Sequence, residues 1–358
     1  MRIKNIVKEI GVYILCALII WYIIHGLMYS KEIINEVYLS VLRCLEIIIP
    51  SLFGMMVLSE LIIKTGIYRK LSVLFLPLTK FILRMPNPLF FVFLLGNVAG
   101  YPVGVKLLSQ LCDNGVIEKK TAENMSVFCF GSGLAFVIGT VGVKLYSNVK
   151  AGAIIYISCV LANLLFAVFF GIFTKYGFKK EKCRLDFSSE TLVKSVESAG
   201  KSMFMICVMI VFFSGFLATL ESLDFFRHIK SPEFAAVIKS IAEISNVTKL
   251  PSSISLLPVI TFAISFGGLC VFIQLMAIVR NSFSLKKFFL TRIPISLTAS
   301  IINLLIFRLF PVAESCMTEF SFVYNDRKTS VFSSICLIFM IIIIFFQKKT
   351  GNSEKSVL

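Results

Sequence analysis

Long stretches without charged residues alternate with short polar segments along most of the chain. A run of about 18 apolar residues is long enough to cross a hydrocarbon core of about 30 Å as an α-helix. Two of the long runs carry charges near their ends, and the others are almost uncharged. These runs are residues 11–28, 41–63, 125–143, 152–173, 202–220, 289–310 and 331–346. The pattern predicts an all-α polytopic membrane protein.

Two apolar stretches fit a simple spanning helix badly. Residues 250–279 contain no charge and would measure about 45 Å as one helix, but Gly267 and Gly268 interrupt them. Residues 85–105 contain six Pro and Gly residues, which a continuous helix does not tolerate well. Irregular backbone at membrane depth is tolerated only inside protein or beside a water-filled cavity. We therefore expect re-entrant hairpins made of broken helices near residues 86–112 and 251–280.

The order of elements repeats on either side of a polar linker. In each half a span is followed by an amphipathic surface helix, a Gly-broken stretch, a Lys-Lys pair and two more apolar runs. If both broken stretches re-enter, each half crosses the membrane three times, and the halves form the inverted repeats known from transporters. The expected organisation is an anchor helix (1–30), a first transport repeat (40–176), a cytoplasmic linker (177–201), a second transport repeat (202–346) and a polar tail (347–358).

The basic residues bear on this topology, because cytoplasmic loops are enriched in Lys and Arg. Seven of them lie between residues 175 and 201, which favours a cytoplasmic linker and N-terminus. Re-entry of residues 250–279 leaves Arg280, Lys286 and Lys287 outside, against this rule, whereas a full crossing restores the rule and removes the inversion. We favour the hairpin because a central Gly-Gly pair is hard to place in one crossing. Position 283 is then expected outside and position 325 inside.

Composition agrees with a membrane protein. Hydrophobic residues make up 57% and charged residues 16%, against roughly 45–50% and 25% in soluble domains. The net charge of +16 comes mainly from short loops between apolar runs, so we expect a lipid bilayer and no nucleic acid as partner. The ten Cys lack a CxxC pair and there are only two His. We therefore expect no metal, no cofactor and no enzymatic activity.

The polar and Gly-rich positions of the broken stretches are the candidate substrate-binding residues. Pro102 is suited to the first turn of a new half-helix, whose free N–H groups favour an anion, and Lys106 follows one turn later. A Lys at membrane depth indicates function, although helix packing through Gly-x-x-x-Gly and a Lys that reaches the interface are alternatives.

Two further interruptions complete this candidate site. Gly131-Ser132-Gly133 breaks a span, either for close packing or as an unwound stretch that faces a cavity, and Gln274 follows the Gly-Gly pair. The complete set is Asn97, Gly100, Tyr101, Pro102, Gly104, Lys106, Gly131, Ser132, Gly133, Ser265, Gly267, Gly268 and Gln274.

Several of these motifs together resemble a known family. The element order, Gly100-Tyr101-Pro102-x-Gly104-x-Lys106, Gly131-Ser132-Gly133, and Phe266-Gly267-Gly268 with Gln274 are similar to the YlbJ (SpoVV) sporulation integral membrane proteins. These belong to the nucleoside-recognition or Gate-domain group, whose layout is similar to that of the concentrative nucleoside transporters. The resemblance covers residues 40–346. It implies a multi-pass protein of the bacterial cell membrane, at the outer forespore membrane, that moves dipicolinic acid during sporulation.

We therefore expect a carrier or facilitator for a small organic anion, with dipicolinate as the first substrate to test. A cation-coupled transporter of nucleosides or other metabolites is one alternative. A membrane scaffold without transport activity, in which the Gly motifs serve packing alone, is another. The sequence leaves the coupling ion, the direction of transport and the formation of a homo-oligomer open.

Overall fold

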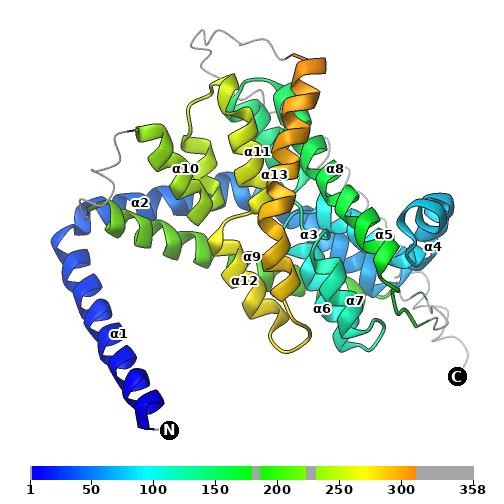
Figure 1. The fold of residues 1–358 in the computed structure, drawn as a ribbon, viewed down its shortest axis with the longest axis horizontal. Coiled ribbons are helices and arrows are strands. Elements are labelled where there is room, and N and C mark those ends of the chain that lie inside the picture. The colour runs from blue at the N-terminus through cyan, green and yellow to red at the C-terminus, as the bar shows by residue number, and fades with distance from the viewer. Residues whose placement is uncertain (1, 180–184, 186, 223–230, 312–358) are drawn as a thin grey trace, which may run out of the picture.

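The chain folds into a helical bundle, seen here in a computed structural model that describes residues 2–179, 185, 187–222 and 231–311 (Figure 1). The α-helices are α1 (Arg2–Met28), α2 (Ser30–Arg43), α3 (Ile49–Lys64), α4 (Ile67–Leu71), α5 (Asn87–Val98), α6 (Val103–Asp113), α7 (Lys119–Ser126), α8 (Val149–Phe173), α9 (Ser189–Ser222), α10 (Pro232–Ala242), α11 (Leu257–Phe266), α12 (Leu269–Val279) and α13 (Lys286–Leu309). The π-helical and 3-10 segments are η1 (Cys44–Ile48), η2 (Ser72–Phe75), η3 (Leu78–Leu83), η4 (Phe136–Leu145), η5 (Ile244–Lys249) and η6 (Ile254–Leu256). The expected span 331–346 and the tail 347–358 lie outside the described residues.

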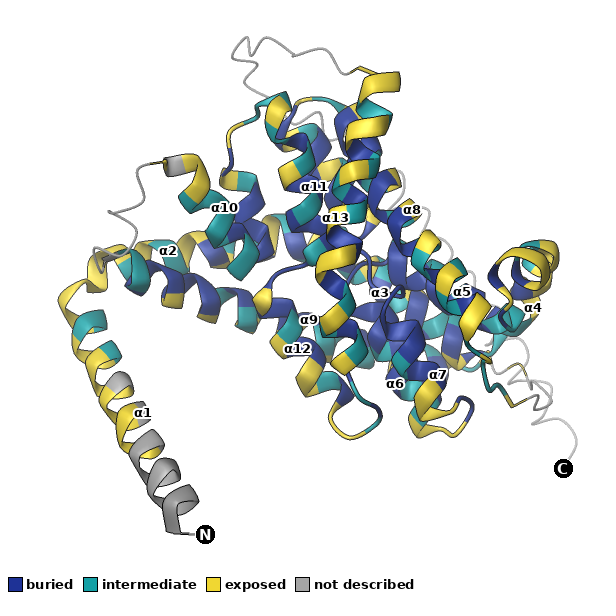
Figure 2. Cartoon of the chain, viewed as in Figure 1, coloured by how far each residue is buried: buried dark blue, intermediate teal, exposed yellow. Residues whose placement is uncertain are grey.

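Five helical segments within the described residues are long and apolar enough to cross a membrane. They are Ser30–Lys64, Val149–Phe173, Ser189–Glu221, Ile254–Val279 and Lys286–Leu309. Large apolar side chains remain exposed along them, such as Phe204 and Leu290, while their inner faces are buried (Figure 2). Exposed apolar side chains of this kind suit contact with lipid. The chain is therefore an all-α, multi-pass integral membrane protein, as predicted.

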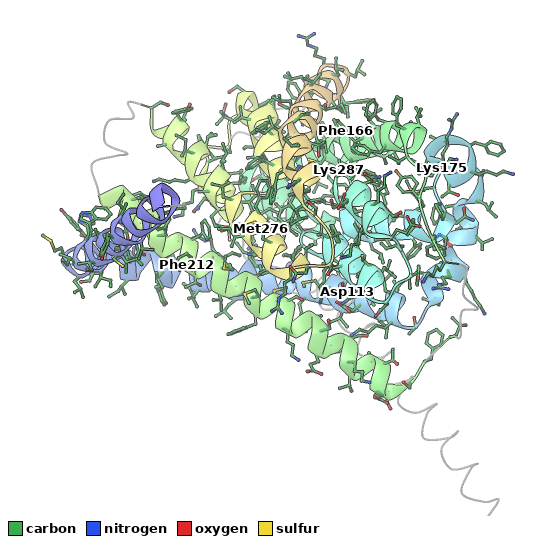
Figure 3. All side chains as sticks on the ribbon, turned by 60° about the horizontal axis from the view of Figure 1, so that its bottom comes forward. Asp113, Phe166, Lys175, Phe212, Met276 and Lys287 are labelled. Atoms are coloured by element: carbon green, nitrogen blue, oxygen red, sulfur yellow. The ribbon has the colours of Figure 1, made fainter. Side chains whose placement is uncertain are left out.

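Contacts between distant segments define two ends of the bundle. At one end, Lys287 Nζ donates to Asn124 Oδ1 at 2.6 Å, Lys179 N donates to Val116 O at 3.0 Å, and Lys64 Nζ donates to Lys194 O at 2.8 Å. We call this the basic end, and Figure 3 shows it with Asp113, Lys175 and Lys287 labelled. At the far end, Lys249 pairs with Glu36 at 2.7 Å and Lys239 with Glu221 at 2.6 Å.

Residues 87–113 form a helical hairpin that enters from the basic end, and we call it hairpin 1. Helices α5 and α6 pack against each other close to their junction at Ala99–Pro102. The outer end of α6 remains at the basic end, because Ser109 Oγ lies 2.9 Å from Ser282 Oγ. A hairpin lies where the Pro and Gly pattern of residues 86–112 predicted one.

The prediction of a second hairpin at residues 251–280 is wrong. Contacts run in order along α13: Ser300 Oγ donates to Pro258 O at 2.8 Å, Arg292 Nη2 donates to Ser265 Oγ at 3.0 Å, and the Phe272 ring centroid lies 5.4 Å from that of Phe288. Helices α11 and α12 therefore lie end to end beside α13 (Figure 1). The Gly-Gly pair breaks a helix that continues in the same general direction, so this segment crosses the bundle.

The second hairpin lies just before this broken span, at residues 232–250, and we call it hairpin 2. Its two legs are α10 and η5, and the ion pairs of Lys239 and Lys249 hold them to the far end. Its tip reaches the Gly-Gly pair, because a Cβ built on Gly268 would lie 3.2 Å from Ile244 N. The amphipathic pattern of this piece predicts a helix on the membrane surface, whereas in the structure it enters the bundle.

Each half of the chain thus contains a span, a hairpin, a broken span and a second span. In the first half these are α3, hairpin 1, α7 with η4, and α8; in the second half they are α9, hairpin 2, α11 with α12, and α13. The first broken span leaves the basic end at α7 and reaches the far end after η4, where Tyr146 OH donates to Ser253 O at 3.2 Å. If each of these spans crosses the membrane, each half has three crossings, and we expect the halves to have opposite orientations with the second hairpin at residues 232–250.

This arrangement makes a topological prediction that reverses the one made for position 283. Asn281 and Lys119 are exposed at the basic end, and Lys150 is exposed at the far end. Cysteines introduced at 281 and 119 are expected to react with an impermeant maleimide from the cytoplasmic side, and a cysteine at 150 from the opposite side. Labelling of 281 and 150 from the same side would contradict the crossing of α11 and α12.

Candidate functional site

A cavity lies at the centre of the bundle, where the two hairpin tips and the two helix breaks meet. Tyr101 comes from the tip of hairpin 1, Ser132 from the first break (residues 127–134), Glu243 and Ser245 from the tip of hairpin 2, and Gln274 from α12. Apolar walls are provided by Ile48, Leu52, Phe136, Ile206, Ile210, Ile244, Cys270 and Val271. The cavity offers about 30 Å³ to water, enough for about one or two molecules.

Glycines allow hairpin 1 to pack directly on the backbone of the first break. A Cβ built on Gly104 would lie 2.0 Å from Cys129 O, and one built on Gly131 would lie 2.6 Å from Asn97 Cα. Gly100 and Gly133 face each other with φ of +91° and +75°, values that favour glycine. These predicted site residues therefore shape the backbone around the cavity, which agrees with the packing explanation for the Gly motifs.

A pair of buried amides fixes the unwound backbone of the first break. Asn97 Nδ2 donates to Phe128 O at 3.3 Å, and Asn163 Nδ2 donates to Phe130 O at 2.9 Å. Asn163 Nδ2 also donates to Asn97 Oδ1 at 2.7 Å, which joins α8 to hairpin 1. Asn97, predicted as a ligand-facing residue, thus supports the site by satisfying carbonyls that a broken helix leaves free.

The second break contacts the first through an aromatic ring. A Cβ on Gly267 would lie 2.6 Å from the edge of Phe130 and 3.6 Å from the Tyr101 ring. The Tyr101 and Phe130 rings are stacked with centroids 4.8 Å apart. Gly267 has φ of +88° and leaves this space open. The two breaks and the tip of hairpin 1 therefore form one packed unit beside the cavity.

Three polar atoms from different elements have no hydrogen-bond partner within this unit. Tyr101 OH, Ser132 Oγ and Gln274 Oε1 are buried and unpaired, and all three residues line the cavity. Buried polar groups in proteins are nearly always satisfied, so an unpaired cluster calls for an explanation such as a ligand or water. All three were predicted as site residues from the sequence.

A buried cation lies behind the aromatic pair. Arg292 on α13 is 1% exposed, and its guanidinium carbon lies 5.0 Å from the Phe130 ring centroid. Nη2 donates to Ser265 Oγ at 3.0 Å and Nη1 donates to Val127 O at 3.4 Å, while Nε has no partner. Among the described residues Arg292 forms no ion pair with an acid. Arg292 does not line the cavity but lies behind Phe130, and its charge is uncompensated there, which is costly for a buried group.

Lys106 does not line the cavity. Its Nζ lies 2.5 Å from Glu60 Oε1 and donates to Ser202 Oγ at 2.7 Å and Ser198 Oγ at 2.9 Å. The pair is almost fully buried, with side-chain exposures of 13% for Lys106 and 3% for Glu60. The hypothesis that Lys106 neutralises substrate charge therefore gives way to a structural ion pair that fastens hairpin 1 to α3 and α9.

The remaining predicted residues flank the site. Pro102 precedes the first turn of α6, and Ser265 and Gly268 border the second break. Four site residues were missed: Glu243, Ser245, Cys270 and Arg292. Glu243 and Ser245 lie in a segment assigned to the surface, and Arg292 lies in a span with charged ends. For Arg292, the signal available in the sequence was a basic residue within an apolar run. Among the described residues no three His, Cys, Asp or Glu side chains cluster to hold a metal.

These features define a class: an integral membrane protein with two hairpins and two broken spans around a central cavity that has mostly apolar walls. Discontinuous helices that meet near the midplane are typical of secondary transporters. The chain is 24% identical over 372 residues to the sporulation integral membrane protein YlbJ of Bacillus subtilis (strain 168), and the alignment covers 87% of this chain and 90% of YlbJ. No family model matches the chain, and no solved structure matches it.

Proposed function

We propose that this protein is a secondary carrier or facilitator that moves a small organic anion through the central cavity. The observation that carries the proposal is the cluster of three unpaired polar atoms, on Tyr101, Ser132 and Gln274, at the meeting point of both repeats. A scaffold that needed only packing would gain stability from apolar side chains at these positions.

We infer the charge of the substrate from Arg292, which lies behind Phe130 beside the cavity and would contact the substrate once the cavity widens. This buried cation, without an acidic partner among the described residues, favours an anion, and its planar guanidinium suits a carboxylate. Helices α6 and α12 also begin beside the cavity, and their N-termini add the positive ends of two helix dipoles. An organic anion is therefore favoured over a neutral nucleoside.

Dipicolinate fits this chemistry and is the substrate we propose. It carries two carboxylates on an aromatic ring, and the cavity wall offers the Tyr101 ring for stacking. The similarity to a sporulation membrane protein adds a physiological context, the membranes of a sporulating bacterial cell. Because room of about 30 Å³ is far below that of a drug-sized ligand site, the site must widen to accept this substrate.

Transport by the purified protein in liposomes tests the proposal. Vesicles loaded with unlabelled dipicolinate are expected to take up labelled dipicolinate by exchange, and excess unlabelled dipicolinate outside should suppress this uptake. Nucleosides should not compete. Competition by nucleosides alone would favour the nucleoside alternative. Absence of exchange with either substrate, in folded protein, would favour the scaffold.

A further inference from the structure

We propose that Glu243 binds and releases a proton during transport, so that the carrier moves its anion together with a proton. This inference rests on the proposed function and adds the co-transported ion. Glu243 lies at the tip of hairpin 2, lines the cavity and is 1% exposed. An acidic side chain in the cavity of an anion carrier calls for an explanation, because two negative charges at close range repel each other.

The carboxylate of Glu243 has no cation at ion-pair distance among the described residues. Its oxygens accept from Ser245 N at 2.9 Å and from Ser245 Oγ at 2.5 Å. Two cations lie within its electrostatic reach without touching it: Arg43, whose Nη2 donates to Ser214 Oγ at 3.4 Å, and Lys249, which pairs with Glu36 at 2.7 Å. A negative charge on Glu243 is thus held by neutral donors from its own hairpin.

The other titratable groups around Glu243 do not balance its charge. Cys44 on η1, Cys270 on α12 and Tyr101 on hairpin 1 lie within its electrostatic reach. Thiols and phenols are ordinarily neutral near pH 7, so they add no positive charge. Because Arg43 and Lys249 act on Glu243 only from beyond ion-pair distance and burial disfavours a charged carboxylate, protonation neutralises Glu243 while the cavity is closed.

One proton on Glu243 lowers the net negative charge of the substrate, Arg292 and Glu243 together from −2 to −1. A dicarboxylate brings two negative charges, and Arg292 provides one positive charge. A proton on Glu243 removes a third negative charge and supplies an O–H donor toward the substrate. When hairpin 2 opens to water on the other side, the proton leaves for water and the carboxylate is solvated.

A proton explains the site better than a metal cation. Both carboxylate oxygens already accept hydrogen bonds from Ser245. Glu243 also belongs to no group of three His, Cys, Asp or Glu side chains in the described part of the chain. Hard cations ordinarily bind through several oxygen ligands and more than one carboxylate.

The test uses the full-length protein in liposomes with labelled dipicolinate and the membrane potential clamped at zero. With the interior about one pH unit more alkaline, one-to-one coupling to a proton accumulates the substrate up to about tenfold. The wild-type protein is expected to accumulate substrate and to alkalinise the medium. Glu243→Gln keeps an acceptor for Ser245 but carries no proton, so it is expected to exchange substrate at a rate that does not vary with pH, without accumulation.

Two matched variants accompany this test. Glu243→Asp keeps the acid and should retain accumulation, and Glu36→Gln removes a carboxylate of the same end outside the cavity and should also retain it. Accumulation by Glu243→Gln, or its loss of exchange, would overturn the proposal, as would wild-type exchange that is indifferent to a pH gradient. Accumulation driven by a Na⁺ gradient at equal pH would assign a metal cation instead. Absence of wild-type exchange would refute the proposed function itself.

Discussion

Replacement of Arg292 by Gln is expected to weaken the apparent affinity for dipicolinate by about 10- to 150-fold, since a charge-assisted contact is worth about 1.5–3 kcal/mol. Gln can still donate to Ser265 or Val127, so the local hydrogen bonds of α13 are partly retained. Arg292→Lys should restore only part of the affinity, because an ammonium lacks the planar fork that matches a carboxylate. The measurement is the concentration dependence of exchange in liposomes.

Thermal unfolding of the same variants separates this role from a structural one. Removing a buried cation that has no acidic partner among the described residues should not lower stability, because its desolvation cost disappears with it. Arg308→Gln, an exposed position on the same helix, is the matched control for expression and insertion. A fall in stability with unchanged affinity would show that Arg292 serves packing alone.

Replacement of Lys106 by Gln is expected to lower stability and to leave the affinity for dipicolinate unchanged, the opposite of the result expected for Arg292→Gln. It leaves the Glu60 carboxylate, which is 3% exposed, without its nearest cation, and breaking a buried ion pair in this way costs about 3–5 kcal/mol. Lys64 and Gln110 remain near Glu60 at 3.5 and 3.2 Å and should hold the loss at the lower end of that range. The midpoint of thermal unfolding in detergent therefore falls, while affinity for dipicolinate stays the same.

A double replacement tests this explanation. Lys106→Met combined with Glu60→Leu removes both charges and is expected to recover most of the lost stability. Lys201→Gln breaks an exposed ion pair with Glu197 and should change little. Reduced affinity at unchanged stability in Lys106→Gln would return Lys106 to the substrate site.

Much of the fold could be predicted from the pattern of apolar runs, because each span must satisfy its own backbone in lipid. The position of hairpin 2 could not. Its leg α10 carries Lys239, which gives it the pattern of a surface helix, whereas in the fold this Lys pairs with Glu221 at the far end. The first broken span was predicted at residues 125–143 with its break at Gly131–Gly133, but its first part, α7, was missed, since it begins with Lys119 and Lys120 and its polar sequence resembles a loop.

The site was predictable where glycine and proline mark irregular backbone, which is how Tyr101, Ser132 and Gln274 were found. Long-range pairing could not be predicted. Glu60 and Lys106 are 46 residues apart, and only the packing of hairpin 1 against α3 brings them together. The roles of Arg292 and Glu243 depend on the residues that pack around them in the fold, and a local sequence pattern does not reveal these neighbours.

The hydrogen bond that the Asn163 side-chain amide donates to Asn97 makes the two halves of the chain mechanically unequal. It ties hairpin 1, the first break and α8 into one stiff frame. At the tip of hairpin 2, by contrast, the side chains of Glu243 and Asn246 bond to residues of that same hairpin. Displacing this tip breaks none of those bonds, and the ion pairs of Lys239 and Lys249 hold the legs of hairpin 2 rather than its tip. The frame is therefore expected to stay fixed while the tip of hairpin 2 moves when the protein opens.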